Sequence, residues 1–127
     1  MPQPIVNVLV VDDYPNMRLM LKNMLRQIGF RDVYMAEDGS SALVQLGERG
    51  FRLIISDWNM APMTGFQLLK EVRADEKLKE TKFILVTAES KTENVIAAKQ
   101  AGVNNYIVKP FNAETLKTKL KAVIGEF

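Results

Sequence analysis

Four short apolar runs in this sequence end at polar or charged residues whose side chains could together perform phosphoryl chemistry. Asp12 and Asp13 follow the first run, Asp57 the second, Thr87 the third and Lys109 the fourth. A carboxylate can attack a phosphoryl group, while other acids hold a metal ion and cationic or hydroxyl groups bind phosphoryl oxygens. The five residues therefore supply the components needed for phosphoryl transfer to a carboxylate.

Bringing the three aspartates together requires a compensating charge. Close carboxylates repel, so one of Asp12, Asp13 and Asp57 would tend to hold a proton. Magnesium resolves the repulsion, because it accepts a few protein carboxylates, keeps several waters and leaves room for a phosphate oxygen. We therefore expect a magnesium site at these acids, with the Lys109 ammonium and the Thr87 hydroxyl available to phosphoryl oxygens.

Each of these residues also has an ordinary structural explanation. Asp12 and Asp13 could cap the helix that follows them, because acids often accept the first N–H groups of a helix. Asp57 alone could be a loop acid, Thr87 a residue at a strand end and Lys109 a solvated lysine. The functional interpretation rests on their conjunction, since all five fall at strand ends on one side of the predicted sheet.

The bulk composition narrows the class of protein. The chain has 127 residues, 47% of them hydrophobic and 25% charged, which is typical of one globular domain. It contains no cysteine and no histidine, which excludes thiolate chemistry and a phosphohistidine on this chain. The net charge of +2 gives no reason to expect nucleic-acid binding, and the sequence offers no membrane-spanning or secretory pattern. We expect a cytoplasmic protein.

Five apolar segments predict strands, and the amphipathic segments between them predict helices. Continuous apolar runs are typical of strands buried on both faces of a parallel sheet. Alternating strands and helices predict an α/β fold with one such sheet, and the carboxyl ends of its strands should meet at one edge. The expected strands are residues 5–11, 32–35, 51–56, 83–87 and 105–108.

Local signals mark where the helices begin. Pro15 suits the first turn of a helix, because its missing N–H would have no partner there. Thr64 to Gln67 and Ser90 to Glu93 both have the Ser/Thr-x-x-Glu/Gln form of a capping box, and Asn112 can cap the last helix. The charged residues 75–82 are expected to form a solvated loop or helix end.

The motifs at the strand ends resemble the receiver domain of bacterial two-component response regulators, and especially the single-domain, CheY-like chemotaxis regulators. The resemblance spans nearly the whole chain and is strongest in residues 10–13, 36–39, 55–60, 86–89 and 106–110. It implies a flavodoxin-like, doubly wound (βα)5 sandwich whose parallel strands run in the order 2-1-3-4-5. It also implies one receiver domain over residues 1–127, without an effector domain.

The resemblance assigns a role to each residue of the site. Asp57 would accept a phosphoryl group from a sensor histidine kinase. Asp13, Asp57 and the backbone carbonyl of Asn59 would bind magnesium directly, while Asp12 would hold a metal-bound water. Thr87 and Lys109 would contact the phosphoryl oxygens, and the peptide bond from Lys109 to the following proline is expected to be cis. The protein would be no enzyme beyond catalysing its own phosphorylation and dephosphorylation.

Family members convert phosphorylation into a change of surface. Thr87 would be drawn toward the phosphoryl group, and Tyr106 would turn into the space that it leaves. The output face would be the fourth helix, fifth strand and fifth helix. A monomer is expected, which binds a downstream target such as the flagellar motor switch and does not bind DNA or membranes. The candidate contact residues are Val95, Tyr106, Val108, Phe111 and Lys119.

One loop departs from the family pattern, and other functions remain open. The usual Asp-x-x-Met-Pro-x-Met-Asp-Gly is replaced here by a loop with Ala61, a displaced Pro62, and Thr64 in place of an acid. The same receiver could serve as a phosphorelay intermediate or a phosphate sink. A haloacid dehalogenase-type phosphatase would need a second acid where Asn59 stands, and a flavodoxin would need a Ser/Thr/Gly-rich phosphate loop after residues 5–11.

Overall fold

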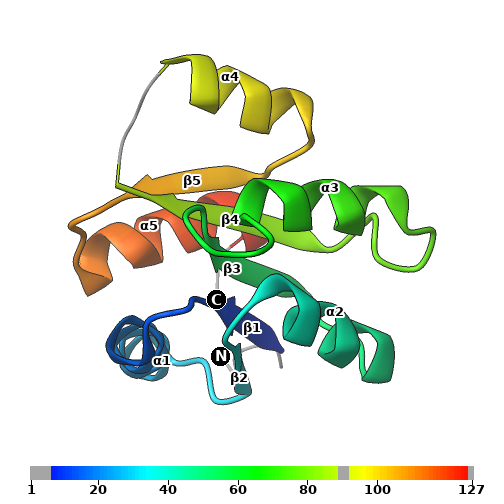
Figure 1. Ribbon diagram of the computed structural model, residues 1–127. Helices are drawn as coiled ribbons and strands as arrows, with labels where there is room; N and C mark the ends of the chain where they lie inside the picture. Colours follow the sequence, from blue (N-terminus) through cyan, green and yellow to red (C-terminus); the bar gives the residue numbers. More distant parts are fainter. Residues whose placement is uncertain (1–6, 89–91, 126–127) are drawn as a thin grey trace.

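The computed structural model describes residues 7–88 and 92–125, which form strands and helices in strict alternation (Figure 1). The strands are β1 (Val8–Val11), β2 (Val33–Ala36), β3 (Leu53–Asp57), β4 (Lys82–Thr87) and β5 (Asn105–Val108). The helices are α1 (Pro15–Ile28), α2 (Gly39–Glu48), α3 (Gly65–Ala74), α4 (Thr92–Gln100) and α5 (Ala113–Ile124). Among the described residues, no helix is both long and apolar enough to cross a membrane.

The sheet is parallel with the strand order β2-β1-β3-β4-β5, as the resemblance implied. The chain reverses its direction of progress across the sheet between β1 and β3, which is where open α/β sheets place their ligands. The register aligns the strand ends, because Val11 lies opposite Ser56 and Thr87 lies opposite Val108. Residues that follow these positions therefore meet at one edge.

Helices cover both faces of the sheet because each central strand is apolar on both sides. Leu9 and Val11 of β1 belong to a core cluster with residues of α2, α3 and α4. Val8 and Val10 belong to a second cluster with residues of α1 and α5. Figure 1 shows the resulting three-layer arrangement, with α1 and α5 on one face of the sheet and α2, α3 and α4 on the other.

Strand boundaries differ from the sequence prediction by one or two residues. Within the described residues β1 begins at Val8, and residues 5 and 6 of the predicted strand lie outside them. Lys82 was expected in a solvated loop but begins β4, where it pairs with Leu53. β3 extends through Asp57, so this acid is the last residue of the strand and not the first residue of a loop.

The predicted helix caps are mostly confirmed. Thr64 forms the expected capping box with Gln67, and Asn112 accepts a hydrogen bond from the backbone N–H of Thr115. The predicted box at Ser90 lies outside the described residues. The alternative that Asp12 and Asp13 cap the first helix is wrong, because the N-cap of α1 is Tyr14 and it makes no side-chain capping bond.

Arg73, near the end of α3, joins two connecting segments, the one between α3 and β4 and the one between α4 and β5. Its guanidinium donates to the carbonyl oxygens of Lys79, Thr81 and Gly102 at 3.0, 2.6 and 2.9 Å. It also donates to Asn104 Oδ1 at 3.0 Å, and that same oxygen accepts from the N–H of Phe83 at the start of β4. One side chain thus donates to backbone carbonyls both in the segment before β4 and in the segment between α4 and β5.

We expect Arg73→Met to lower the free energy of unfolding by about 2–3 kcal/mol, because several carbonyls lose a charged donor while the aliphatic stem is kept. Urea unfolding monitored by circular dichroism measures the change. Lys79→Met is the control, since among the described residues the Lys79 side chain makes only an exposed ion pair with Glu76 at 3.0 Å, and its loss should cost less than about 0.5 kcal/mol. Equal stability of the two variants would contradict the role given to Arg73.

Candidate functional site

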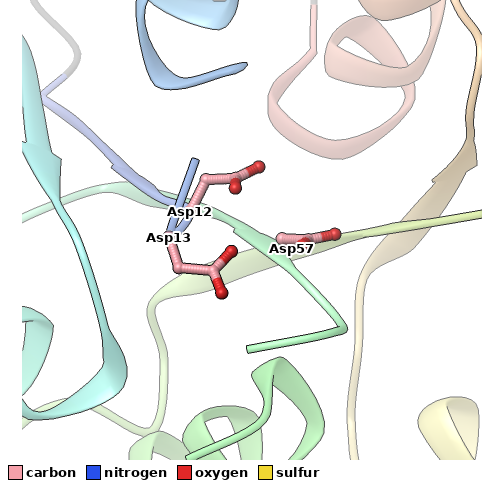
Figure 2. Close-up of side chains that lie close together, drawn as sticks. All are labelled: Asp12, Asp13 and Asp57. Atoms are coloured by element: carbon pink, nitrogen blue, oxygen red, sulfur yellow. The ribbon is translucent and has the colours of Figure 1, made fainter. Parts of the chain in front are cut away.

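Three carboxylates meet at the edge where β1 and β3 end (Figure 2). One oxygen from each of Asp12, Asp13 and Asp57 lies within 4.8 Å of the others. Asp12 and Asp57 are 0% and 2% exposed, whereas Asp13 is open to solvent. The sequence prediction that these acids gather is confirmed. Asp12 and Asp57 form the buried part of the cluster, and Asp13 faces solvent.

Two buried carboxylate oxygens lack a hydrogen-bond partner among the described residues, namely Asp12 Oδ2 and Asp57 Oδ1. Asp12 Oδ1 accepts from the N–H of Tyr14 at 2.9 Å. Asp57 Oδ1 forms an ion pair with Lys109 Nζ at 3.1 Å without hydrogen-bond geometry. Buried oxygens are rarely left unsatisfied, so the donor set fits a hard, oxygen-preferring cation such as magnesium.

Burial makes both inner carboxylates weaker acids. Loss of hydration is the largest effect on Asp12 and raises its pKa from 3.8 to about 6, although the Tyr14 N–H opposes the shift and the Asp57 charge adds to it. Burial also raises the pKa of Asp57, while Lys109 opposes that increase. The sequence predicted that repulsion between the carboxylates would make one of them hold a proton. In the structure, loss of hydration raises the pKa values of Asp12 and Asp57 more than the neighbouring negative charges do.

We expect the metal-free protein to gain stability as the pH falls from about 7 to 5. The folded pKa of Asp12, about 6, lies above its unfolded value near 3.8, so the folded state binds more protons between these values. Asp12→Asn should weaken this dependence, leaving the part due to Asp57, and raise the free energy of unfolding near pH 7 by about 1–2 kcal/mol. Urea unfolding in EDTA at both pH values tests this, and a variant less stable than wild type near pH 7 would contradict it.

Lys109 and Thr87 stand on neighbouring strands beside the acids. The Lys109 N–H donates to the Thr87 carbonyl at 2.8 Å, which fixes the course of the chain just after β5. The Lys109 side chain is 23% exposed and reaches Asp57, while Thr87 is 9% exposed at the end of β4. The peptide bond before Pro110 is cis, as expected, and the bond before Pro62 is also cis. The structure therefore brings both predicted phosphoryl-binding residues to the site.

The loop after β3 carries Asn59, whose side chain is exposed. The loop is closed at its base, because the Trp58 N–H donates to the Val86 carbonyl at 2.8 Å and the Gly65 N–H donates to the Trp58 carbonyl at 2.9 Å. Asn59 therefore lies next to an anchored residue at the metal-site edge. Its backbone carbonyl as a magnesium ligand stays a prediction.

The predicted output residues lie on α4, β5, α5 and the segment between β5 and α5. Tyr106 is half-buried, packs against the core, and has Lys119 Nζ 5.0 Å from its ring centroid. Val95 and Val108 are also half-buried. Phe111 packs against the core cluster beneath α1 and α5, so part of its side chain is buried in the protein's own interior. The arrangement is consistent with one output face, whose use as such stays a prediction.

Comparison with known protein families shows to which family a chain with this fold and this cluster of acids belongs. The family model for the response regulator receiver domain matches residues 8–121. The chain belongs to the response regulator receiver domain family. It is also 48% identical over 118 residues to the chemotaxis protein CheY of Pseudomonas aeruginosa, covering 93% of this chain and 95% of that protein. The receiver is therefore of the CheY-like type.

Solved receiver structures share the fold. Vibrio cholerae chemotaxis protein CheY4 superimposes with a TM-score of 0.89 at 38% identity, covering 95% of this chain and all 100% of that one. The receiver domain of a sensor histidine kinase from Pseudomonas aeruginosa PAO1 superimposes with a TM-score of 0.85 at 28% identity, covering 97% and 100% of the two chains. That neighbour has a magnesium ion coordinated in its active-site cleft.

Three residues that adjoin the receiver's site were not predicted from the sequence. Arg18 Nη1 donates to the backbone carbonyl of Asp12 at 2.7 Å and holds the end of β1. Gly65 lies against the backbone of Asp57, and Phe66 stacks on Trp58. Gly65 belongs to the family pattern of the loop, whereas a helical arginine and an aromatic residue carry no signal by themselves.

Proposed function

We propose that this receiver accepts a phosphoryl group on Asp57 in a magnesium-dependent reaction and thereby controls a chemotaxis target. The observation that carries the proposal is the placement of Asp57 Oδ1, buried among two further carboxylates and 3.1 Å from Lys109 Nζ. The proposed nucleophile Asp57, two further acids that would bind the metal, and the Lys109 ammonium then lie at one edge of the sheet. Membership of a CheY-like family of two-component response regulators supports the same function.

Asp12, Asp13 and Asp57 would hold the magnesium ion, together with the Asn59 backbone carbonyl. The solved receiver neighbour with magnesium in its cleft supports this assignment. When bound, magnesium neutralises negative charge on the phosphoryl oxygens during transfer. The unsatisfied oxygens of Asp12 and Asp57 are the groups in this chain that such an ion would complete.

The chain's own residues account for the remaining chemistry. A carboxylate oxygen of Asp57 forms a bond to phosphorus as the bond from phosphorus to the histidine nitrogen of a sensor kinase breaks, and the imidazole leaves. The Lys109 ammonium releases its pairing with Asp57 Oδ1 and takes a phosphoryl oxygen, which balances part of the added charge. The Thr87 hydroxyl donates to another oxygen. The same site then admits water for dephosphorylation.

The signal would leave through the face formed by α4, β5 and α5. Movement of Thr87 toward the phosphoryl group would change the packing around Tyr106, which contacts both the core and Lys119. A downstream protein such as the flagellar motor switch would then bind the altered face. The CheY relative supports this direction of signalling, and we propose that the regulator acts in the cytoplasm and as a monomer.

Phosphorylation itself is tested with a small phosphodonor. Purified protein incubated with acetyl phosphate and magnesium should gain the mass of one phosphoryl group, and EDTA should prevent the gain. The aspartyl phosphate should disappear within minutes after the donor is removed, as suits a chemotaxis signal. A phosphoryl group stable for hours would favour a phosphate sink or relay, and no gain at all would contradict the proposal.

We expect Lys109→Arg to keep phosphorylation but weaken signalling by about tenfold or more. Arginine preserves the positive charge near Asp57, yet its planar guanidinium cannot occupy the position of a compact ammonium. Mass spectrometry should show a phosphorylated fraction near that of wild type, while swarming of a strain that carries the variant should fail. Lys82→Arg is the control, because Lys82 is exposed at the far end of β4, and it should leave both measurements unchanged.

A further inference from the structure

An aromatic pair supports the loop that leads from the proposed phosphoacceptor to the metal site. The rings of Trp58 and Phe66 are stacked, with centroids 5.4 Å apart and an angle of 9° between their planes. Lys70 Nζ lies 5.5 Å from the Phe66 ring centroid on the next turn of α3. Trp58 directly follows Asp57 in the chain, so the stack connects the first turn of α3 with the residue beside the nucleophile.

Trp58 is held from two sides, and only one of them is the hydrophobic core. The indole packs against the core cluster that contains Met60, Leu68 and other buried residues. Its other support is Phe66, which is half-buried and lies outside both core clusters of the described residues. Loss of the Phe66 ring would therefore remove little core packing but would free one side of Trp58.

The backbone of Asn59 depends on its two neighbours. Asn59 is exposed, whereas Met60 is only 6% exposed and is fixed by the core. On the other side, Trp58 is fixed by its two backbone hydrogen bonds and by the stack on Phe66. A carbonyl that binds magnesium must be held in place, because magnesium demands near-octahedral geometry. Phe66 therefore supplies one of the contacts that hold Trp58, and through Trp58 it constrains Asn59.

We propose that Phe66 is a positioning residue of the magnesium site, which holds the Asn59 carbonyl in its binding orientation by stacking on Trp58. The inference rests on the proposed magnesium-dependent function. Phe66→Leu removes the flat ring face but keeps an apolar side chain, so magnesium affinity should fall about three- to tenfold, the range expected for loss of one aromatic contact. Phe66→Tyr keeps the ring and should bind magnesium as wild type does.

The experiment measures magnesium dissociation constants by isothermal titration calorimetry on the full chain, beside urea unfolding in EDTA. Gln67→Ala is the matched control, because it removes the hydrogen bond that the Thr64 N–H donates to Gln67 Oε1 in the same helical turn, without touching the rings. Weaker binding by Phe66→Leu, with normal binding by Phe66→Tyr and Gln67→Ala, supports the inference.

The other outcomes are equally informative. Normal magnesium affinity in Phe66→Leu overturns the positioning role, and so does a loss in Gln67→Ala as large as that in Phe66→Leu, since helix stability would then explain both. A Phe66→Tyr variant as weak as Phe66→Leu also overturns it. Absence of magnesium binding in the wild-type protein contradicts the proposed function itself, which separates the two failures.

Discussion

Asp57→Asn should reduce phosphorylation by acetyl phosphate at least a thousandfold, to below detection by intact-mass spectrometry. The amide keeps the size and planarity of the carboxylate, but it is neutral and a poor nucleophile. It also removes one of the three carboxylates that would hold magnesium. Asp57 is 2% exposed at the end of β3, so the substitution changes chemistry in a site whose shape the surrounding strands preserve.

Two controls separate the loss of the nucleophile from general damage. Asp32→Asn changes an exposed aspartate next to the start of β2 and should be phosphorylated as wild type is. Unfolding of Asp57→Asn in EDTA should show no loss of stability, because burial raises the pKa of Asp57 and a neutral side chain avoids that unfavourable charge. Strong labelling of Asp57→Asn at another residue would disprove the assignment of the phosphoacceptor.

The sheet was predictable because its strands are apolar on both faces. Val8–Val11 and Leu53–Asp57 are buried throughout, and such runs leave few alternatives to a parallel sheet between helices. Strand ends were less certain, since a polar residue can end a strand or extend it. Lys82 joins β4 although its side chain is exposed, because its backbone pairs with Leu53 at the amino end of the strand.

The residues of the site were predictable for a related reason. Parallel strands place their carboxyl ends on one edge, so acids, a threonine and a lysine at the ends of four different strands must come close together. The sequence did not reveal what supports them. Arg18 beneath Asp12 and Phe66 against Trp58 act through the course of the backbone, which depends on loop geometry that local residue types do not specify. The dominant effect of burial on the pKa of Asp12 likewise required the packed structure.

Gly65 gives the second large effect, because the backbone of Asp57, the proposed phosphoacceptor, passes directly beneath it. A Cβ at this position would meet the Asp57 carbonyl oxygen and would stand 2.9 Å from the carbonyl carbon and 3.0 Å from Leu85 Cδ2. Neither the backbone nor a core leucine can move freely. Gly65→Ala should therefore lower the free energy of unfolding by about 2–4 kcal/mol, since it forces an overpacked contact. Urea unfolding measures this change.

The same substitution should also weaken the site. Displacement of the Asp57 backbone moves its carboxylate relative to Asp12 and Asp13, so magnesium affinity should fall about tenfold or more, in keeping with the strict geometry of that ion. Gly47→Ala is the matched control, because a Cβ there meets nothing within 4 Å. It lies in α2, where alanine should add up to about 1 kcal/mol of stability and leave magnesium binding unchanged. Equal behaviour of the two alanine variants would show that the close approach to Asp57 does not constrain position 65. Opposite changes in stability would show that the Asp57 backbone leaves no room for a Cβ there.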